Sequence, residues 1–322
     1  MGVTAQALIT DLRLKLADSG TLIGPDQQEP PRFSLFHAPN SICSQKARVV
    51  LAHHQISYKS FSMSIPAGQT YLPDYVRLRL LGCRHSGLPL VNAHSGSTSV
   101  SAGGCDPAVV PTLVDHLTDQ VIIDSKTICL YLDALVPELK RLSPLSQQQA
   151  IDAELEIVDN LPNYQMMAGR PAGCDPRPQS LQQMNGVNFA LSKVKRCEQY
   201  IAEYAGDTEL VRAYQAKRSK ELDAADTLFS EEAVEAAYAK ARASCAQLNE
   251  KLALRRGTNW LMGPSITLAD LFWAVELLRM KNLGAAHIWE QDKLPAVEMF
   301  VAAAGDLASI RSAVLDWPGA LL

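Results

Sequence analysis

The chain has 322 residues, of which 47% are hydrophobic and 20% are charged. This composition is typical of a globular protein with a sizeable core and excludes a disordered chain. The net charge of −4 gives no basic footprint for nucleic acid or for a membrane surface. No apolar run reaches the roughly eighteen residues of a spanning helix, and Asp11, Arg13 and Lys15 interrupt any signal-peptide core. We therefore expect a cytoplasmic protein.

The seven cysteines agree with a reducing compartment. Their number is odd, they are scattered, and no pair has the C-x-x-C spacing of a dithiol site or a zinc knuckle. Cys83, His85, His94 and Cys105 offer four zinc-type ligands. Their spacing matches no compact zinc motif, so we predict no metal site.

The predicted elements begin with a leader. Residues 1–31 hold one short amphipathic stretch followed by three prolines, which predicts a segment laid over the surface. Residues 32–137 then predict the order β-α-β-α-β-β-α. We expect strands near 33–37 and 57–63, helices near 44–54 and 71–81, and a hairpin within 109–123 that precedes the last helix. Such a unit forms a small mixed sheet with helices on its faces.

Within this α/β domain, residues 82–108 are rich in Gly and Ser and predict an inserted loop. After Pro137 the strand patterns stop, and residues 138–322 predict an all-helical domain. Helical spacing is present at 147–160, 180–204, 208–255, 267–282 and 295–316. Thr267 and Asp270 form a capping box at the start of a core helix.

Ser41 and Cys43 lie at the expected turn from the first strand into the first helix. Unpaired N–H groups at a helix start stabilise a thiolate, whether it belongs to a ligand or to Cys43 itself. Ser41 is able to donate its hydroxyl to that sulfur. The simpler alternative is that Ser41 or Ser44 caps the helix and Cys43 fills a small space. With Lys46 and Arg48 close in sequence, we expect the pKa of Cys43 to lie below that of a free thiol.

Two further pairs are candidates for ligand contacts. Pro111 cannot donate to a ladder and belongs at the start or edge of a strand. If the Val110–Pro111 bond is cis, Val110 presents its backbone to an extended peptide ligand, although trans is the commoner form. Asp124 and Ser125 precede a helix whose free N–H groups, with the Ser125 hydroxyl, suit a carboxylate. The alternative is that Asp124 only caps this helix.

Together these segments resemble the cytosolic glutathione transferase superfamily. The resemblance rests on four segments that begin at Ser41, Val110, Asp124 and Ile266, with the sequences SICSQKAR, VPTLV, DSKTICLYL and ITLADLFW. It runs from about residue 33 to residue 317. It implies a thioredoxin-like N-terminal domain at 32–137, with the insertion 82–108, followed by an all-α substrate-binding domain at 138–322.

The likeness is closer to the bacterial 2,5-dichlorohydroquinone reductive dechlorinases than to tetrachlorohydroquinone dehalogenase, the zeta class or bacterial β-etherases. It implies a glutathione-dependent enzyme of aromatic catabolism that dechlorinates a chlorinated hydroquinone through a glutathione conjugate. One alternative is the cleavage of β-aryl ethers derived from lignin. Another is a weakly catalytic subunit of a heterodimer, for which the insertion would be a partner surface or an active-site cover.

The resemblance also implies a role for each candidate residue. Ser41 hydrogen-bonds the glutathione sulfur, and Cys43 is a second nucleophile. Val110, before a cis Pro111, pairs with the cysteinyl backbone of glutathione, while Asp124 and Ser125 hold its γ-glutamyl end. Glutathione is then a co-substrate, no metal takes part, and we expect a homodimer or a heterodimer with a related subunit.

Overall fold

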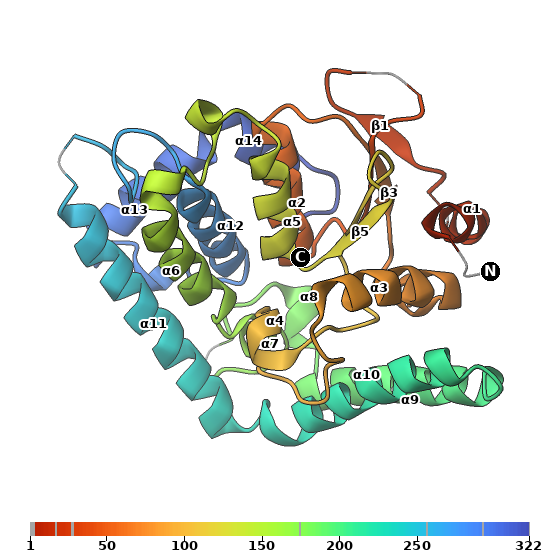
Figure 1. The fold of residues 1–322 in the computed structure, drawn as a ribbon. Coiled ribbons are helices and arrows are strands. Elements are labelled where there is room, and N and C mark those ends of the chain that lie inside the picture. Colours follow the sequence, from red (N-terminus) through yellow and green to blue (C-terminus); the bar gives the residue numbers. More distant parts are fainter. Residues whose placement is uncertain are drawn as a thin grey trace.

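The computed structural model describes residues 4–16, 18–26, 29–173, 175–255, 257–291 and 293–321. In this part of the chain an α/β half is followed by a helical half (Figure 1). The α/β half comprises α1 (Ala5–Lys15), β1 (Thr21–Ile23), β2 (Phe33–His37), α2 (Ile42–His53), β3 (Tyr58–Ser62), a 3₁₀ turn (Gln69–Tyr71), α3 (Pro73–Ser86), α4 (Val100–Gly103), β4 (Thr112–Asp115), β5 (Gln120–Ile123) and α5 (Ser125–Ala134). The sheet order is β1-β3-β2-β4-β5, with β2 and β3 parallel and the other neighbours antiparallel.

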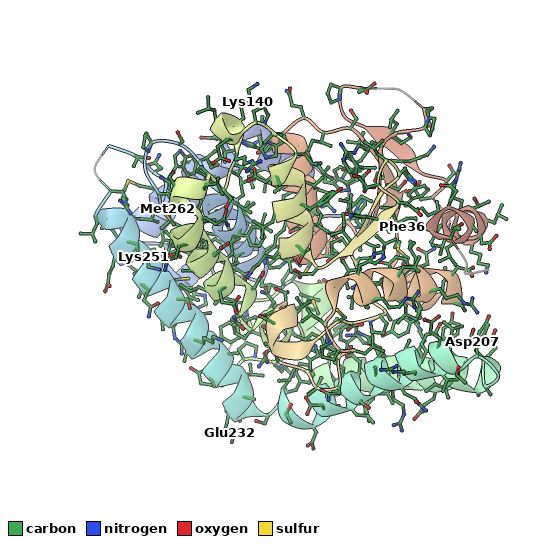
Figure 2. The ribbon with its side chains drawn as sticks, in the orientation of Figure 1. Phe36, Lys140, Asp207, Glu232, Lys251 and Met262 are labelled. Atoms are coloured by element: carbon green, nitrogen blue, oxygen red, sulfur yellow. The ribbon has the colours of Figure 1, made fainter. Side chains whose placement is uncertain are left out.

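Side chains of β2 alternate between two cores, because successive residues of a strand point to opposite faces. Phe33 and Leu35 join the core that α2 and α5 cover, whereas Phe36 joins the core under α3 and α1. The Phe36 ring stacks on Phe61 of β3 with centroids 4.7 Å apart, and Figure 2 shows Phe36 in the interior of this half. The mixed sheet with helices on both faces is the predicted thioredoxin-like architecture.

The leader does more than lie over the surface, which corrects the prediction for residues 1–31. Its strand β1 pairs antiparallel with β3, Thr21 opposite Ser60, and adds a strand at the edge of the sheet. Helix α1 packs on α3 and buries Leu8 and Leu12 in the core that holds Phe61. The prediction missed β1 because three residues are too few to show an alternating pattern.

The insertion begins later than residue 82. Helix α3 continues to Ser86 and ends at Gly87, which has a φ of +68°. Position 82 lies inside α3, where the helix comes close to the sheet, since a Cβ on Gly82 would lie 2.6 Å from Cγ2 of Ile123. Residues 87–108 contain the short helix α4 and one isolated bridge between Leu90 and Cys105.

The helical half surrounds the long buried helix α12, which packs on both α2 and α6 and so joins the two halves. Its helices are α6 (Gln148–Asp159), α7 (Asn163–Ala168), α8 (Gln179–Gln182), α9 (Gly186–Glu203), α10 (Thr208–Thr227), α11 (Glu231–Ala253), α12 (Leu268–Asn282), α13 (Pro295–Gly305) and α14 (Ala308–Ile310). Short helical turns lie at Glu138–Lys140, Leu145–Gln147, Ala285–Ile288 and Arg311–Leu315. The predicted capping box is present, because Asp270 accepts from the backbone N–H of Thr267 at 2.8 Å.

Several details of this half differ from the prediction, and the segments expected over 180–204 and 295–316 are each divided into shorter helices. The helix expected over 208–255 is two helices, because Ser230 caps the start of α11 and accepts from the backbone N–H of Ala233. Figure 2 shows Glu232 at the outer end of α11, beside this break. The short helix α7 was not predicted. The domain limits at residues 31 and 137 stay predictions. Among the described residues, no helix has the length and apolarity needed to cross a membrane.

Candidate active site

A cavity of about 530 Å³ lies between the α/β half, the insertion and the helical half. Residues from three separate segments meet on its wall, and they include every candidate from the sequence: Ser41, Cys43, Val110, Pro111, Asp124 and Ser125. The wall also carries six basic and three acidic side chains, although the whole chain has a net charge of −4. The cavity therefore favours anionic ligands.

Ser41 is the N-cap of α2, and its hydroxyl oxygen accepts from the backbone N–H of Ser44 at 3.4 Å. Ser44 is itself buried and accepts from the backbone N–H of Ala38. Since the Ser41 oxygen serves as acceptor, its hydroxyl hydrogen remains available to a group in the cavity. The capping and the functional interpretations of Ser41 are thus compatible.

The Cys43 thiol is half-buried at the start of α2, near the Ser125 side chain. Burial raises the pKa of this thiol above its ordinary value, while Lys46 acts in the opposite direction. The expected low pKa of Cys43 is therefore wrong. The Arg48 guanidinium donates to the carbonyls of Pro39 and Ala313. Lys46 is held in an ion pair of 2.7 Å with Asp159.

The Val110–Pro111 peptide bond is cis. The carbonyls on either side of Val110 are held by α3, because the Tyr75 hydroxyl donates to Val109 and Arg79 donates to Pro111. In the described part of the chain, neither the N–H nor the C=O of Val110 has a hydrogen-bond partner. This backbone is fixed in place and open to a ligand.

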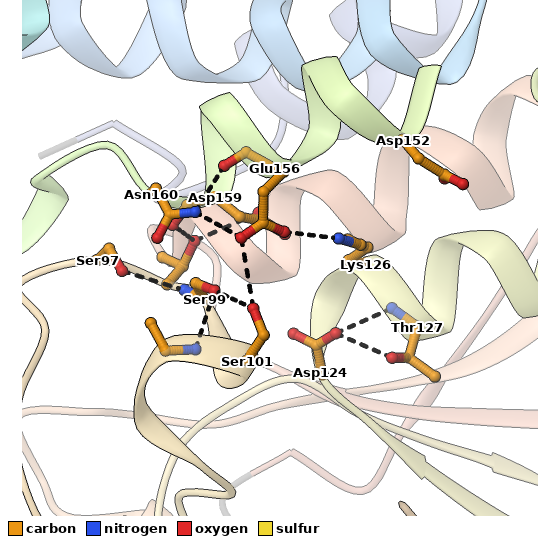
Figure 3. Close-up of polar contacts among 12 residues, drawn as sticks. Ser97, Ser99, Ser101, Asp124, Lys126, Thr127, Asp152, Glu156, Asp159 and Asn160 are labelled. Atoms are coloured by element: carbon orange, nitrogen blue, oxygen red, sulfur yellow. Dashed lines mark hydrogen bonds and ion pairs between the residues drawn. The ribbon is translucent and has the colours of Figure 1, made fainter. Parts of the chain in front are cut away.

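Asp124 has a φ of +70°, a strained conformation for a residue other than glycine. As N-cap of α5, its Oδ2 accepts from the N–H and the hydroxyl of Thr127, both at 3.0 Å (Figure 3). Its Oδ1 accepts from no group within the described residues. Burial and the charge of Asp159 raise the pKa of Asp124. Asp124 therefore caps the helix with one oxygen and leaves the other available.

The insertion closes the cavity from the outside, and residues between Val91 and Ala108 line it. It is held to two helices of the helical half. Ser101 donates to Glu156 of α6, which also accepts from Lys126 of α5 at 3.1 Å (Figure 3). The backbone N–H of His94 donates to Asp223 of α10 at 2.7 Å. Of the two roles considered for the insertion, this geometry favours an active-site cover.

The helical half supplies a group of polar residues that the sequence did not reveal. Tyr164 of α7, Lys193 of α9 and Glu221 of α10 meet on the cavity wall, with Lys217 and Lys220 beside them. Only the spacing of Lys217 and Glu221, one helical turn apart, was visible in the sequence, and such pairs are common on helices. In the described part of the chain, no group of three or more His, Cys, Asp or Glu is placed to hold a metal ion.

The sheet, its cis proline and the helical second half define a thioredoxin-like protein of two parts. The model of the glutathione S-transferase N-terminal domain matches residues 40–135. A 2,5-dichlorohydroquinone reductive dechlorinase from Sphingobium indicum is 36% identical over 316 residues, which cover 94% of this chain and 90% of the relative. The chain therefore belongs to the glutathione transferase family, as the sequence resemblance implied.

Solved structures show the same fold. The β-etherase LigF from Sphingobium sp. strain SYK-6 has a TM-score of 0.56 at 15% identity and covers 88% of this chain and 98% of its own. A bacterial zeta-class maleyl pyruvate isomerase has a TM-score of 0.52 at 16% identity, with 90% and 100% covered. The predicted fold class, a thioredoxin-like domain followed by helices, is confirmed.

Proposed function

We propose that this protein is a glutathione-dependent enzyme that removes chlorine reductively from a chlorinated hydroquinone. The observation that carries the proposal is the convergence of three distant segments, each suited to a different part of one tripeptide, on a single cavity. The relative from Sphingobium indicum, 36% identical along nearly the whole chain, supports the substrate class. A homodimer or a heterodimer with a related subunit remains part of the proposal.

Glutathione would lie along the sheet side of the cavity. The unpaired backbone of Val110 offers one donor and one acceptor to its cysteinyl residue, in the manner of an added strand. The γ-glutamyl carboxylate would lie at the start of α5 near the Ser125 hydroxyl, and its ammonium group would lie near Oδ1 of Asp124. The Ser41 hydroxyl would then donate to the glutathione sulfur and stabilise its thiolate.

The reaction would use two sulfur nucleophiles in turn. The glutathione thiolate adds to the keto form of the hydroquinone, and chloride leaves with its electron pair. Cys43 then attacks the glutathionyl sulfur, so that the carbon–sulfur bond breaks and a mixed disulfide with glutathione forms. The Cys43 thiol gives up its proton in this step, and the ring carbon takes up a proton in place of the sulfur. A second glutathione regenerates the thiol and leaves as glutathione disulfide.

The test of this function compares the wild type with Cys43→Ser. The wild type is expected to form the dechlorinated hydroquinone and glutathione disulfide, whereas Cys43→Ser stops at the glutathionyl hydroquinone, which mass spectrometry identifies. Cys245→Ala serves as control, because Cys245 is buried away from the cavity.

Two outcomes would reject this function. If the wild type leaves chlorohydroquinones unchanged while Cys43→Ser cleaves a β-aryl ether at full rate, the enzyme is an etherase, in which glutathione displaces a phenolate without a protein cysteine. If calorimetry detects no binding of glutathione at millimolar concentration, both enzyme versions fail, and the protein is a structural subunit.

A further inference from the structure

The cluster of Tyr164, Lys193, Lys217, Lys220 and Glu221 carries more positive than negative charges. Glu221 accepts from Lys217 through Oε1 at 2.8 Å and from Lys193 through Oε2 at 3.2 Å. Asp106 of the insertion accepts from Lys217 at 2.7 Å and from Lys220 at 2.9 Å. Three ammonium groups thus share two carboxylates, and one positive charge remains in a largely buried place. Burying an unpaired charge costs free energy unless a bound anion compensates it.

Lys193 is the member of this group best placed to receive that anion. Its Nζ donates to the Tyr164 hydroxyl at 2.8 Å and to Glu221, which uses two of the three N–H bonds of an ammonium group. Lys193 lines the cavity and is partly exposed there, whereas Lys217 is almost fully buried between its two partners. One donor of Lys193 is therefore left for a ligand.

Aromatic and apolar groups surround this ammonium. Nζ of Lys193 lies 4.2 Å from the ring centroid of Phe189 and 4.4 Å from that of Tyr164. His94 of the insertion stacks on Tyr164, with the ring centroids 4.5 Å apart. Met167 and Met184 complete an apolar wall beside them. A flat aromatic ligand with one anionic oxygen fits this combination of a cation and a hydrophobic surface.

We propose that Lys193 binds the phenolate oxygen of the aromatic substrate and so orients the ring toward the glutathione side of the cavity. The proposal rests on the proposed function, because a hydroquinone is the substrate that would bring a phenolate to this site. Tyr164 and Glu221 are positioning residues, since they hold the Lys193 ammonium from α7 and α10.

The ionisation of Lys193 supports this role. Burial lowers its pKa to about 8, against the attraction of Glu221 and together with the charges of Lys217 and Lys220. On the other sides it faces the Tyr164 hydroxyl, which is neutral in this range, and the insertion, which contributes His94 and Asp106 to the same cluster. An ammonium close to losing its proton is a strong donor to an oxygen anion, and a bound phenolate would raise its pKa again.

The experiment measures binding without turnover. The protein is saturated with S-methylglutathione, which cannot react, and is titrated with a dichlorophenol and with its methyl ether. The absorption spectrum distinguishes phenol from phenolate, so it reports the ionisation of the bound probe directly. The variants are Lys193→Met, Lys193→Arg and the matched control Lys195→Met, which removes an exposed lysine from the same helix.

The wild type is expected to bind the dichlorophenol as phenolate, at a pH where the free probe is still partly protonated. Lys193→Met should weaken phenolate binding about tenfold to a hundredfold, the usual range for a hydrogen bond to a charged group. It should leave the binding of the methyl ether unchanged, because the ether carries no anionic oxygen. Lys193→Arg should keep most of the phenolate affinity, and Lys195→Met all of it. In the wild type, phenolate affinity should decline above about pH 8, as Lys193 loses its proton.

Other results would overturn the proposal. Equal loss of phenolate and ether binding in Lys193→Met, without recovery in Lys193→Arg, would show that Lys193 only supports the structure. A dichlorobenzoate that binds more tightly than the phenolate and depends on Lys193 would assign the site to carboxylates. Binding of phenolate through Lys193 by a wild type that does not dechlorinate would reject the proposed function and keep this one. Normal dechlorination, together with phenolate binding that is unchanged in Lys193→Met, would reject the role of Lys193 and keep the proposed function.

Discussion

His37 ends β2 with both nitrogens of its buried ring engaged. Nε2 lies 2.7 Å from the Ser60 hydroxyl, and Nδ1 lies 3.1 Å from a guanidinium nitrogen of Arg48. Since a guanidinium only donates, Nδ1 must accept, and the ring is neutral with its proton on Nε2. Burial and the charge of Arg48 lower the pKa of His37 to about 3. Protonation would place two cations in contact inside the core.

His37 should therefore make the fold sensitive to acid. The pKa of His37 is lower in the folded chain than in the unfolded one. Between about pH 6.5 and about pH 3 the unfolded chain therefore binds more protons, and the free energy of unfolding decreases as the pH is lowered. The contribution of one such proton is at most about 1.4 kcal/mol per pH unit. Urea unfolding of the wild type and of His37→Asn, from pH 7 to pH 4, measures it. The variant should be less stable at pH 7 and lose less on acidification, and parallel slopes would contradict the argument.

At Cys43 the chemistry depends on directions that the sequence does not show. Lys46 and Arg48 follow Cys43 closely, and their nearness suggested a low pKa. In the folded chain Arg48 points to the carbonyl of Pro39, and Lys46 is neutralised by Asp159. The helix start was predictable from Ser41 as a cap, but Asp159, which pairs with Lys46, lies 113 residues further along the chain.

Helix α3 approaches β5 so closely that only glycine fits at position 82. A Cβ there would meet Cγ2 of Ile123 at 2.6 Å and the carbonyl oxygen of Val121 at 3.1 Å. Gly82→Ala should therefore destabilise the protein by about 1 to 3 kcal/mol, as overpacking does. Gly305→Ala, near the end of α13 with no heavy atom within 4 Å, is the matched control. It should be neutral or stabilise by up to about 1 kcal/mol.

Thermal or urea unfolding of both variants tests this contact between helix and sheet. If the two substitutions shift the unfolding midpoint equally, steric overlap between α3 and β5 does not determine the stability of Gly82→Ala.

The helices and strands that were predicted well have a recognisable signal in their own short stretch of sequence. The short apolar runs of β2 and β4, and the capping residues of α2, α5 and α12, are local signals. The break between α10 and α11 was hidden, because Ala, Glu and Lys continue across it and only the single cap at Ser230 marks it. The side of the cavity formed by Ser41, Val110 and Asp124 was predicted because these residues lie in local turns. The Lys193 side was not, because it forms only when three helices meet.

The two halves of the molecule are joined by a buried ion pair. Lys46 of α2 and Asp159 of α6 lie 2.7 Å apart with almost no exposed side-chain surface. Nζ of Lys46 also lies 4.6 Å from the ring centroid of Phe272 in α12. The Lys46 ammonium of α2 thus interacts with residues of α6 and α12 in the helical half. It is also close enough to Cys43 to act on the pKa of that thiol.

Removing one partner of this pair should be costly, because the other charge stays buried. Lys46→Met and Asp159→Asn should each destabilise the protein by about 3 to 5 kcal/mol, and the double variant by clearly less than their sum. Urea unfolding of the four proteins gives the coupling energy. If the losses of the two single variants add up in the double variant, Lys46 and Asp159 do not stabilise the contact between the two halves as a pair.

The short strand β1 has a consequence for the behaviour of many copies in solution. Without it, β3 would present its free hydrogen-bonding groups at the edge of the sheet, and an uncovered edge is a template for intermolecular pairing and aggregation. β1 covers that edge with only three residues, Thr21–Ile23, and is itself too short to recruit another strand. By pairing with β3, β1 therefore limits the pairing of that edge with a second copy of the chain.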